Sequence, residues 1–142
     1  MLWDTQKYSL KSVYQGHEVG ILSMSCSPNG QLLASASEDG EVVLWRIEQR
    51  SNQSAAELNL VEIQNIYGEH KEGVDSITFS SGSDKLIFSS KDSMIQVVDL
   101  KDNELERVLQ GHTDKINYVC MNKEETLIAS ASADKTIKLW DA

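Results

Sequence analysis

The feature that most constrains this chain is a segment that occurs in it three times. Residues 16–46 (GHEVGILSMSCSPNGQLLASASEDGEVVLWR) align with residues 111–141 (GHTDKINYVCMNKEETLIASASADKTIKLWD) from end to end without a gap. A third copy lies between them at residues 69–99 (EHKEGVDSITFSSGSDKLIFSSKDSMIQVVD). In every copy the same number of residues separates a His from the position of the last Trp. Such a repeat predicts an architecture in which each unit buries its apolar face against its neighbours.

Within each copy, apolar and polar residues alternate in short runs that turn-forming residues interrupt. This period of two is typical of half-buried β-strands. We predict strands a, b and c in each copy, at 19–26, 31–37 and 41–47, at 74–80, 85–90 and 94–100, and at 115–121, 126–132 and 136–142. A strand d follows each Trp position, at 7–15, 58–67 and 104–110. Four antiparallel strands per unit make a propeller blade.

The Gly-His pairs at 16–17 and 111–112 and the Trp-Asp pairs at 3–4 and 140–141 resemble those of the WD40 family. The resemblance covers nearly the whole chain. It implies an all-β fold, namely a WD40 β-propeller segment of about three four-stranded antiparallel blades. The blades are circularly offset, because strand d comes first in the chain and strand c comes last.

By this resemblance, residues 1–142 form a single WD40 repeat region with four parts. These are strand d of a preceding or shared blade (1–15), a first repeat (16–67), a degenerate second repeat (68–110) and a third repeat without its strand d (111–142). The second repeat is degenerate because Val98 stands at the Trp position and Glu69 separates Gly68 from His70. Extra polar residues near 48–58 predict a loop inserted between strands c and d of the first repeat.

Three blade equivalents do not close a propeller, which usually needs four to eight blades. The chain is therefore expected to be a piece of a longer WD40 protein. Two alternatives stay open. Two copies of the chain could form a six-bladed ring by heterologous contacts, or blades of a different protein could complete an open arc.

Each repeat also carries a His, a Ser and an Asp at matching positions. In the first repeat, His17, Ser37 and Asp39 offer the chemical types of a serine hydrolase. A catalytic site is needed once, however, whereas these residues recur in every copy as a structural device would. We therefore expect no catalytic residues and no enzyme activity.

In WD40 proteins, which the chain resembles, the matching positions form a buried hydrogen-bond chain from Asp to His to Ser to the Trp indole. A buried indole N–H needs such a partner. The resemblance implies two complete chains, formed by His17, Ser37, Asp39 and Trp45 and by His112, Ser132, Asp134 and Trp140. The second repeat keeps His70, Ser90 and Asp92 but has no indole at this place.

Metal and cofactor binding are not expected, because the three histidines occupy equivalent places in different blades and would be scattered around a ring. The two cysteines fit a reducing compartment, with Cys26 as a small core residue and Cys120 on the opposite strand face. No apolar run approaches the roughly 18 residues of a membrane-spanning helix. Residues 1–4 lack the basic start and apolar stretch of a signal peptide. We predict a cytoplasmic location, with a nuclear one as the alternative, and no membrane partner.

The charge balance favours a protein partner over nucleic acid. Lys plus Arg total 13 against 22 Asp plus Glu, for a formal net charge of -9, whereas phosphate binding needs a basic face. One face of the propeller would carry the d–a and b–c loops. Its candidate binding residues are Glu18, Glu38, Glu69, Lys71, Glu72, Lys91, Thr113, Asp114 and Lys115. Their excess of acids favours a basic peptide or protein, and a solvated charged rim is the alternative.

The expected function is that of a non-catalytic protein–protein interaction scaffold within a multiprotein complex. The alternative is an adaptor or substrate-recognition segment of a larger enzyme assembly such as a ubiquitin ligase. Such adaptors would show Trp-Asp-x-Arg, whereas Trp3-Asp4 is followed by Thr5-Gln6 and lacks the Arg. This functional step rests on family analogy, because a fold alone does not fix a function.

Overall fold

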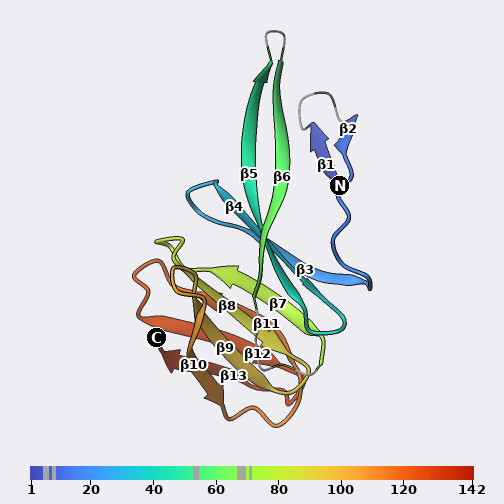
Figure 1. The fold of residues 1–142 in the computed structure, drawn as a ribbon. Helices are drawn as coiled ribbons and strands as arrows, with labels where there is room; N and C mark the ends of the chain where they lie inside the picture. Colours follow the sequence, from blue (N-terminus) through green and yellow to red (C-terminus); the bar gives the residue numbers. More distant parts are fainter. Residues whose placement is uncertain (5–6, 8, 53–54, 67–69, 71) are drawn as a thin grey trace.

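The computed structural model describes the chain except for residues 5–6, 8, 53–54, 67–69 and 71 (Figure 1). Its described part holds thirteen β-strands in four antiparallel sheets and contains no helix. The predicted all-β class is therefore confirmed. Within each sheet, hydrogen-bonded neighbours are consecutive in the sequence, which is the up-and-down order expected of propeller blades.

Two of the sheets are complete four-stranded blades. The first blade consists of β3 (Ile21–Cys26), β4 (Leu32–Ser37), β5 (Val42–Asn52) and β6 (Ala55–Ile66). The second blade consists of β7 (Val74–Phe79), β8 (Lys85–Ser90), β9 (Met94–Asp99) and β10 (Glu104–Gln110).

The other two sheets are smaller and come from the ends of the described chain. The third blade has three strands, β11 (Ile116–Met121), β12 (Leu127–Ser132) and β13 (Ile137–Asp141). Before the first blade, β1 (Leu2–Asp4) pairs with β2 (Ser9–Ser12) in a sheet of two strands. The offset predicted from the sequence, with a strand d near the start and a strand c near the end, agrees with this arrangement.

The tight turns repeat the same backbone from blade to blade. Gly30, Ser83 and Glu125 occupy equivalent places in the a–b turns and have positive φ angles of 70°, 66° and 57°. The b–c turns do the same at Gly40, Ser93 and Lys135, with φ of 90°, 65° and 71°. Only the first repeat places glycine at these positions, where a side chain is strained. The turn geometry is thus set by the strands that it joins.

The insertion in the first repeat is not the irregular loop that its polar sequence predicts. β5 and β6 continue as one antiparallel ladder up to the pair Asn52↔Ala55, so the extra residues form a long β-hairpin. Figure 1 shows this hairpin projecting well beyond the other strands of the blade. The two strands of an antiparallel ribbon pair each other's backbone groups, so residues without an apolar face can continue a ladder that begins in the blade.

The core lies between the blades, which stack face to face. We call the side of a blade that looks toward the next blade its forward face, and the opposite side its backward face. The forward face of the first blade packs on the backward face of the second in a buried cluster that includes Ala34, Ala36, Val42, Leu44, Ile77, Phe79, Leu86, Phe88 and Val98. The second and third blades meet in a cluster of Ile87, Ile95, Val97, Ile116, Val119 and Ile128.

Burial therefore depends on whether a neighbouring blade is present. Cys26, predicted to be a small core residue, is exposed, whereas Phe79 at the same place in the second blade is only 6% exposed. No complete blade covers the backward face of the first blade in the described residues. The pattern that predicted an inward position was correct about the strand face, but it could not supply the cover.

Candidate functional site

The clearest polar arrangement is a hydrogen-bond chain in the third blade. His112 lies 2.6 Å from Asp134 through Nδ1 and 2.8 Å from Ser130 Oγ through Nε2. The Trp140 indole N–H donates to the same Ser130 oxygen at 2.9 Å. Because the Asp134 carboxylate can only accept, each group in the chain donates to the next. The indole N–H donates to the Ser130 hydroxyl, the hydroxyl to His112 Nε2, and His112 Nδ1–H to the carboxylate. Hydrogen bonds from Thr136 and then His112 hold the pKa of Asp134 well below its usual range.

The first blade has the same chain with a different acid. His17 Nε2 lies 2.7 Å from Ser35 Oγ, which accepts from the Trp45 indole at 2.9 Å. Its Nδ1 contacts Glu41 at 3.0 Å, so Asp39, the predicted acid, is not the partner. Asp39 instead accepts from Ser37 Oγ at 2.6 Å, and this bond lowers its pKa.

The predicted serines Ser37 and Ser132 are wrong as partners of the histidines, because the structure uses the serine two residues earlier. Cross-strand register explains the choice. Trp45 pairs with Leu33 and Trp140 with Ile128, so a serine two residues further along the neighbouring strand is the diagonal neighbour of each indole. A serine four residues further along lies too far away.

The predicted serines have another role, which is to fasten loops. Ser132 Oγ donates to the Lys115 carbonyl at 2.9 Å, and Ser90 Oγ donates to the Glu72 carbonyl at 3.1 Å. Ser37 Oγ also lies 3.0 Å from the Glu41 carbonyl within the b–c turn. These contacts hold the d–a loops and b–c turns without involving a histidine.

The second blade lacks both the serine and the Trp of this hydrogen-bond chain. His70 keeps its acid, with Nδ1 2.6 Å from Asp92. Phe88 stands where the other blades have the bonded serine, and its ring lies edge-on to His70 with centroids 5.4 Å apart. His70 Nε2 is buried with no hydrogen-bond partner among the described residues. Sequence reasoning missed Phe88, although aligning it with Ser35 and Ser130 reveals the exchange.

In each blade, one backbone hydrogen bond joins the two segments that form the predicted binding face, the d–a loop and the b–c turn. Glu38 N–H donates to the Gly20 carbonyl at 2.9 Å, and Lys91 N–H donates to that of Gly73 at 3.1 Å. In the third blade, Ala133 N–H donates to the Lys115 carbonyl at 3.0 Å. Each bond closes a d–a loop on the b–c turn of its own blade.

Neighbouring loops also touch. A Cβ on Gly73 would come within 2.8 Å of the Glu38 carbonyl oxygen, so the second blade's d–a loop lies directly against the first blade's b–c turn. The exposed members of the predicted face are Glu18, Glu38, Glu72, Lys91, Thr113, Asp114 and Lys115. Glu69 and Lys71 lie outside the described residues.

A hollow opens on this face between the first and second blades. It is lined by Gly16, Glu18, Asp39, Gly40, Glu41, Asn65, Ile66 and His70. Three of these residues carry carboxylates, and none of the described lining residues is Lys or Arg. The hollow therefore presents negative potential to a ligand that reaches the junction of the two blades.

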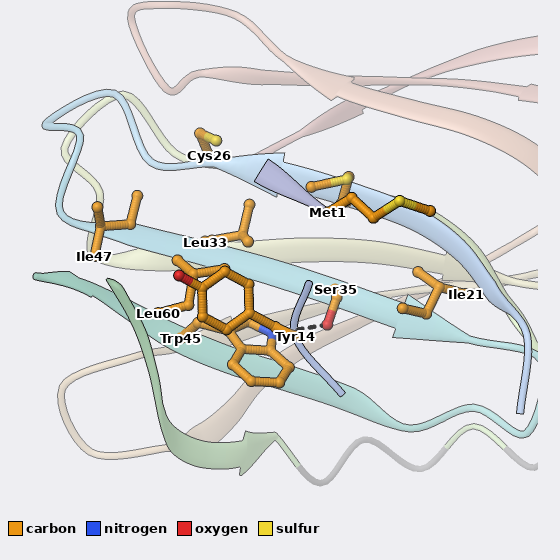
Figure 2. A pocket seen from close by; sticks show the side chains of 10 residues that line it. Met1, Tyr14, Ile21, Cys26, Leu33, Ser35, Trp45, Ile47 and Leu60 are labelled. Carbon is orange, nitrogen blue, oxygen red and sulfur yellow. Dashed lines mark hydrogen bonds between the residues drawn. The ribbon is translucent and has the colours of Figure 1, made fainter. Parts of the chain in front are cut away.

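A second, apolar pocket lies on the backward face of the first blade. Figure 2 shows its lining with the Trp45–Ser35 hydrogen bond at its floor. Its lining residues are Met1, Tyr14, Ile21, Met24, Cys26, Leu33, Ser35, Trp45, Ile47 and Leu60. Tyr14 and Met1 flank the β1–β2 sheet, which places that end of the chain beside the uncovered blade.

The described residues hold no group of three His, Cys, Asp or Glu side chains arranged to bind a metal ion. Over the same residues, the structure contains no apolar helix of membrane-spanning length.

Stacked antiparallel blades with short turns define this chain as part of a β-propeller. A solved structure described as "Crystal structure of RRP9 WD40 repeats" has the same fold, with a TM-score of 0.76 at 18% sequence identity. It covers 90% of this chain, which in turn covers 37% of it. The WD40 family model, described as "WD domain, G-beta repeat", matches residues 8–46, 61–99 and 103–141. The chain therefore belongs to the WD40 family.

Curated relatives are longer than this chain. WD repeat-containing protein 82 of Drosophila melanogaster is 29% identical over 138 residues, which are 96% of this chain and 40% of that protein. The probable coatomer subunit beta' of Schizosaccharomyces pombe is 28% identical over 130 residues, 89% of this chain and 15% of that protein. The chain thus spans less than half the length of these two relatives.

Proposed function

We propose that the chain is a non-catalytic scaffold for protein–protein interaction within a multiprotein complex, and that its acidic loop face binds a basic peptide or protein. WD40 repeats generally mediate protein–protein interaction in complexes. The observation that carries the finer proposal is the hollow between the first two blades, with the carboxylates of Glu18, Asp39 and Glu41 in its wall. A Lys or Arg side chain is the complementary ligand for such a wall.

The manner in which the loops are held supports a binding role. Each d–a loop is closed on its b–c turn by a backbone hydrogen bond, and the second blade's d–a loop lies against the first blade's b–c turn. Loops that are already ordered lose little conformational entropy when a partner binds. The hydrogen bonds to Asp39 lower its pKa, so it keeps its charge at neutral pH.

A binding experiment tests the proposal. The probes are a fluorescein-labelled arginine-rich peptide and the matching peptide with glutamate at every arginine, and the readout is fluorescence anisotropy. We expect binding of the basic peptide only, weakened by added salt because exposed charges are screened. Replacing Glu18 and Glu38 together by Gln removes two exposed charges, each contributing up to about 1 kcal/mol, so affinity should fall roughly tenfold.

The control is Asp102→Asn, which removes one exposed acid from the β9–β10 turn, at the opposite end of the strands from this face. It should leave the affinity unchanged. Equal affinity for the two peptides, or equal losses in the variant and the control, would contradict the proposal and favour a solvated charged rim.

The absence of catalysis is part of the proposal and rests on repetition and burial. The His17, His70 and His112 side chains are 1%, 0% and 0% exposed. Ser35 and Ser130 are almost as well buried, and both accept a hydrogen bond from a Trp indole. A cytoplasmic or nuclear location stays a prediction from the sequence.

A further inference from the structure

Two of the a–b turns hold a side chain where glycine would be easier. Ser83 and Glu125 have left-handed backbone, with φ of 66° and 57°. Their turns are closed in the same way as that of Gly30, since Ser83 N–H donates to the Ser80 carbonyl and Glu125 N–H to the Asn122 carbonyl, both at 3.1 Å. Glycine adopts this backbone without strain, whereas other residues are strained in it. The two side chains therefore call for a physical reason.

Both side chains bond to the blade before their own. Ser83 Oγ, in the second blade, accepts from the Asn29 N–H of the first blade at 3.2 Å. Glu125 Oε1, in the third blade, accepts from the Gly82 N–H of the second blade at 2.6 Å. Asn29 and Gly82 occupy equivalent places, each one residue before the left-handed position of its own turn. The same bond therefore joins the a–b turns at both junctions between the three blades.

The junction of the second and third blades has an additional contact. The Ser81 hydroxyl lies 2.7 Å from Glu125 Oε1 and 2.7 Å from the Lys123 carbonyl oxygen, so its single proton has an acceptor in the third blade either way. Pro28 stands at the place of Ser81 in the first blade and offers no hydroxyl. We call the contact of Ser81 and Gly82 with Glu125 the a–b latch. Because its acceptor is a carboxylate, its bonds are stronger than the neutral bond at the other junction.

The a–b latch lies at the rim of the junction. Ser81 and Gly82 are exposed, and Glu125 is half-buried. Deeper in the same junction, the two blades meet in the buried apolar cluster that includes Ile87 and Val119. Opening of the latch would therefore free one edge of the junction while the apolar cluster still holds the blades together.

The Ser81 hydroxyl is an exposed point at which the charge of the latch can be changed. A negatively charged group at this position cannot donate a hydrogen bond, and it would lie beside the carboxylate of Glu125. Like charges at such a short distance repel each other. Phosphorylation of a serine supplies a charge of this kind.

The charges around the latch do not offset an added negative one. The turn formed by residues 80–84 contains Asp84 and neither Lys nor Arg. Lys85 is already paired with Glu106, with Nζ 2.7 Å from the carboxylate oxygen. Lys123 is exposed, so solvent screens its charge. A negative charge added to this turn would therefore act mainly on the carboxylate of the latch.

We propose that the a–b latch is a conformational switch at the junction of the second and third blades, closed by the Glu125 carboxylate and opened by a negative charge at Ser81. Glu125 keeps its left-handed backbone because the bonds of the latch outweigh the strain. The a–b turns lie at the opposite end of the strands from the d–a and b–c loops, so the switch is independent of the proposed acidic binding face.

The first test asks whether the latch outweighs the strain. Glu125→Gly relieves the strain but removes the latch, so the urea midpoint of unfolding should fall. Lys135→Gly is the matched control, since Lys135 has φ of 71° and its side chain forms no hydrogen bond or ion pair within the described residues. Relief of strain alone should raise its midpoint. An equal rise for both variants would overturn the proposal.

The second test places a charge at Ser81. In Ser81→Asp, the protection of the Gly82 amide against hydrogen exchange, measured by NMR, should fall roughly tenfold because the amide loses a charge-assisted hydrogen bond. Ser81→Asn is the control, because it has nearly the same shape as Ser81→Asp without the charge. Its Gly82 amide should stay as protected as in the parent. Equal protection in the two variants would contradict the switch.

The third test asks whether the charge acts through Glu125. Glu125→Gln keeps an acceptor oxygen for the Gly82 N–H but removes the negative charge. Ser81→Asp added to this background should therefore lower the protection of the Gly82 amide much less than it does in the parent. The difference between the two backgrounds measures the coupling of the two positions. An undiminished effect of Ser81→Asp in the Glu125→Gln background would overturn the proposal.

Discussion

At the scale of single residues, the third blade depends on Ser130. Ser130 is 2% exposed, and its hydroxyl connects Trp140 to His112. One hydroxyl can donate once and accept from the indole at the same time, so every buried polar atom in this hydrogen-bond chain is satisfied. Removing the hydroxyl leaves the indole N–H and the buried His112 Nε2 without their partner.

Ser130→Ala should therefore lower the free energy of unfolding by about 2 kcal/mol, the usual penalty for stranding buried polar groups. Ser132→Ala is the control, because its half-buried hydroxyl bonds to backbone groups of the d–a loop and of the b–c turn and contacts neither His112 nor Trp140. Its cost should stay below about 1 kcal/mol. Urea unfolding followed by Trp fluorescence measures the free energy of unfolding of both variants. An equal or larger decrease for Ser132→Ala would contradict the central place of Ser130 in the hydrogen-bond chain.

The sequence predicts the histidines of these chains and the acid of the third blade, but not the serines. Side chains two residues apart on a strand point to the same face, so alternation cannot distinguish Ser35 from Ser37. Only the cross-strand register makes the choice. The same ambiguity affects the acid of the first blade, where Glu41 contacts His17 in place of Asp39.

Phe88 and Val98 form a coupled replacement in the second blade, where two apolar residues take the places of Ser and Trp. Both are almost fully buried, at 0% and 1% exposure. Phe88→Ser alone should destabilise the chain by about 3 kcal/mol, since it leaves a cavity. Adding Val98→Trp supplies an indole to fill that space and to donate to the new hydroxyl, which in turn can donate to His70 Nε2.

A double-mutant cycle by urea unfolding tests this coupling. The coupling energy between the two substitutions should be favourable and on the order of 1 kcal/mol. The matched pair is Phe88→Ser with Val97→Trp, whose side chain belongs to the forward face of the same strand and cannot reach the cavity. A coupling energy of zero for Phe88 with Val98 would refute the idea that the two positions changed together for a physical reason.

At the scale of elements, the positions of the strands follow from alternation, because each blade shows its neighbours one apolar face and turn residues bound each run. The projecting hairpin does not follow from it. Its polar sequence lacks the apolar face that strand prediction relies on, and its strands only continue the backbone pairing that begins inside the blade. Composition alone therefore indicated a loop where two strands continue.

The projecting part of the hairpin should be dispensable for the fold. The buried cluster of Leu33, Val43 and Trp45 is joined by Ile47 and Leu60, which lie below the projection. In a shortened chain, an Asn-Gly type I′ turn replaces residues 49–58 and connects the pair Glu48↔Asn59. Its melting temperature by circular dichroism should stay within about 2 °C of the parent, since a change of 1 kcal/mol corresponds to roughly 4 °C in a domain of this size. A larger drop would mean that the hairpin stabilises the blade.

At the scale of the whole molecule, the chain is an arc of stacked blades whose two ends differ from its middle. Among the residues that the structure describes, the second blade is covered on both faces, whereas the first and third each have one face without a complete neighbour. The exposed Met24, Ile137 and Leu139 are unusual for a surface but ordinary for a blade interface. Burial at one and the same strand position thus depends on the blade that lies beside it.

Leu139→Glu and Val97→Glu test whether cover by a neighbouring blade decides the cost of a buried charge. Leu139 is 68% exposed on the forward face of the third blade, so a carboxylate there costs the fold little. Val97 lies at the equivalent place in the second blade, where it is 5% exposed and belongs to the cluster shared with the third blade. A carboxylate at that place would be buried between apolar faces without a partner, which is strongly unfavourable. Urea unfolding should therefore show a loss of free energy of unfolding below about 0.5 kcal/mol for Leu139→Glu and a much larger loss for Val97→Glu. Equal losses would contradict the idea that the neighbouring blade decides the cost.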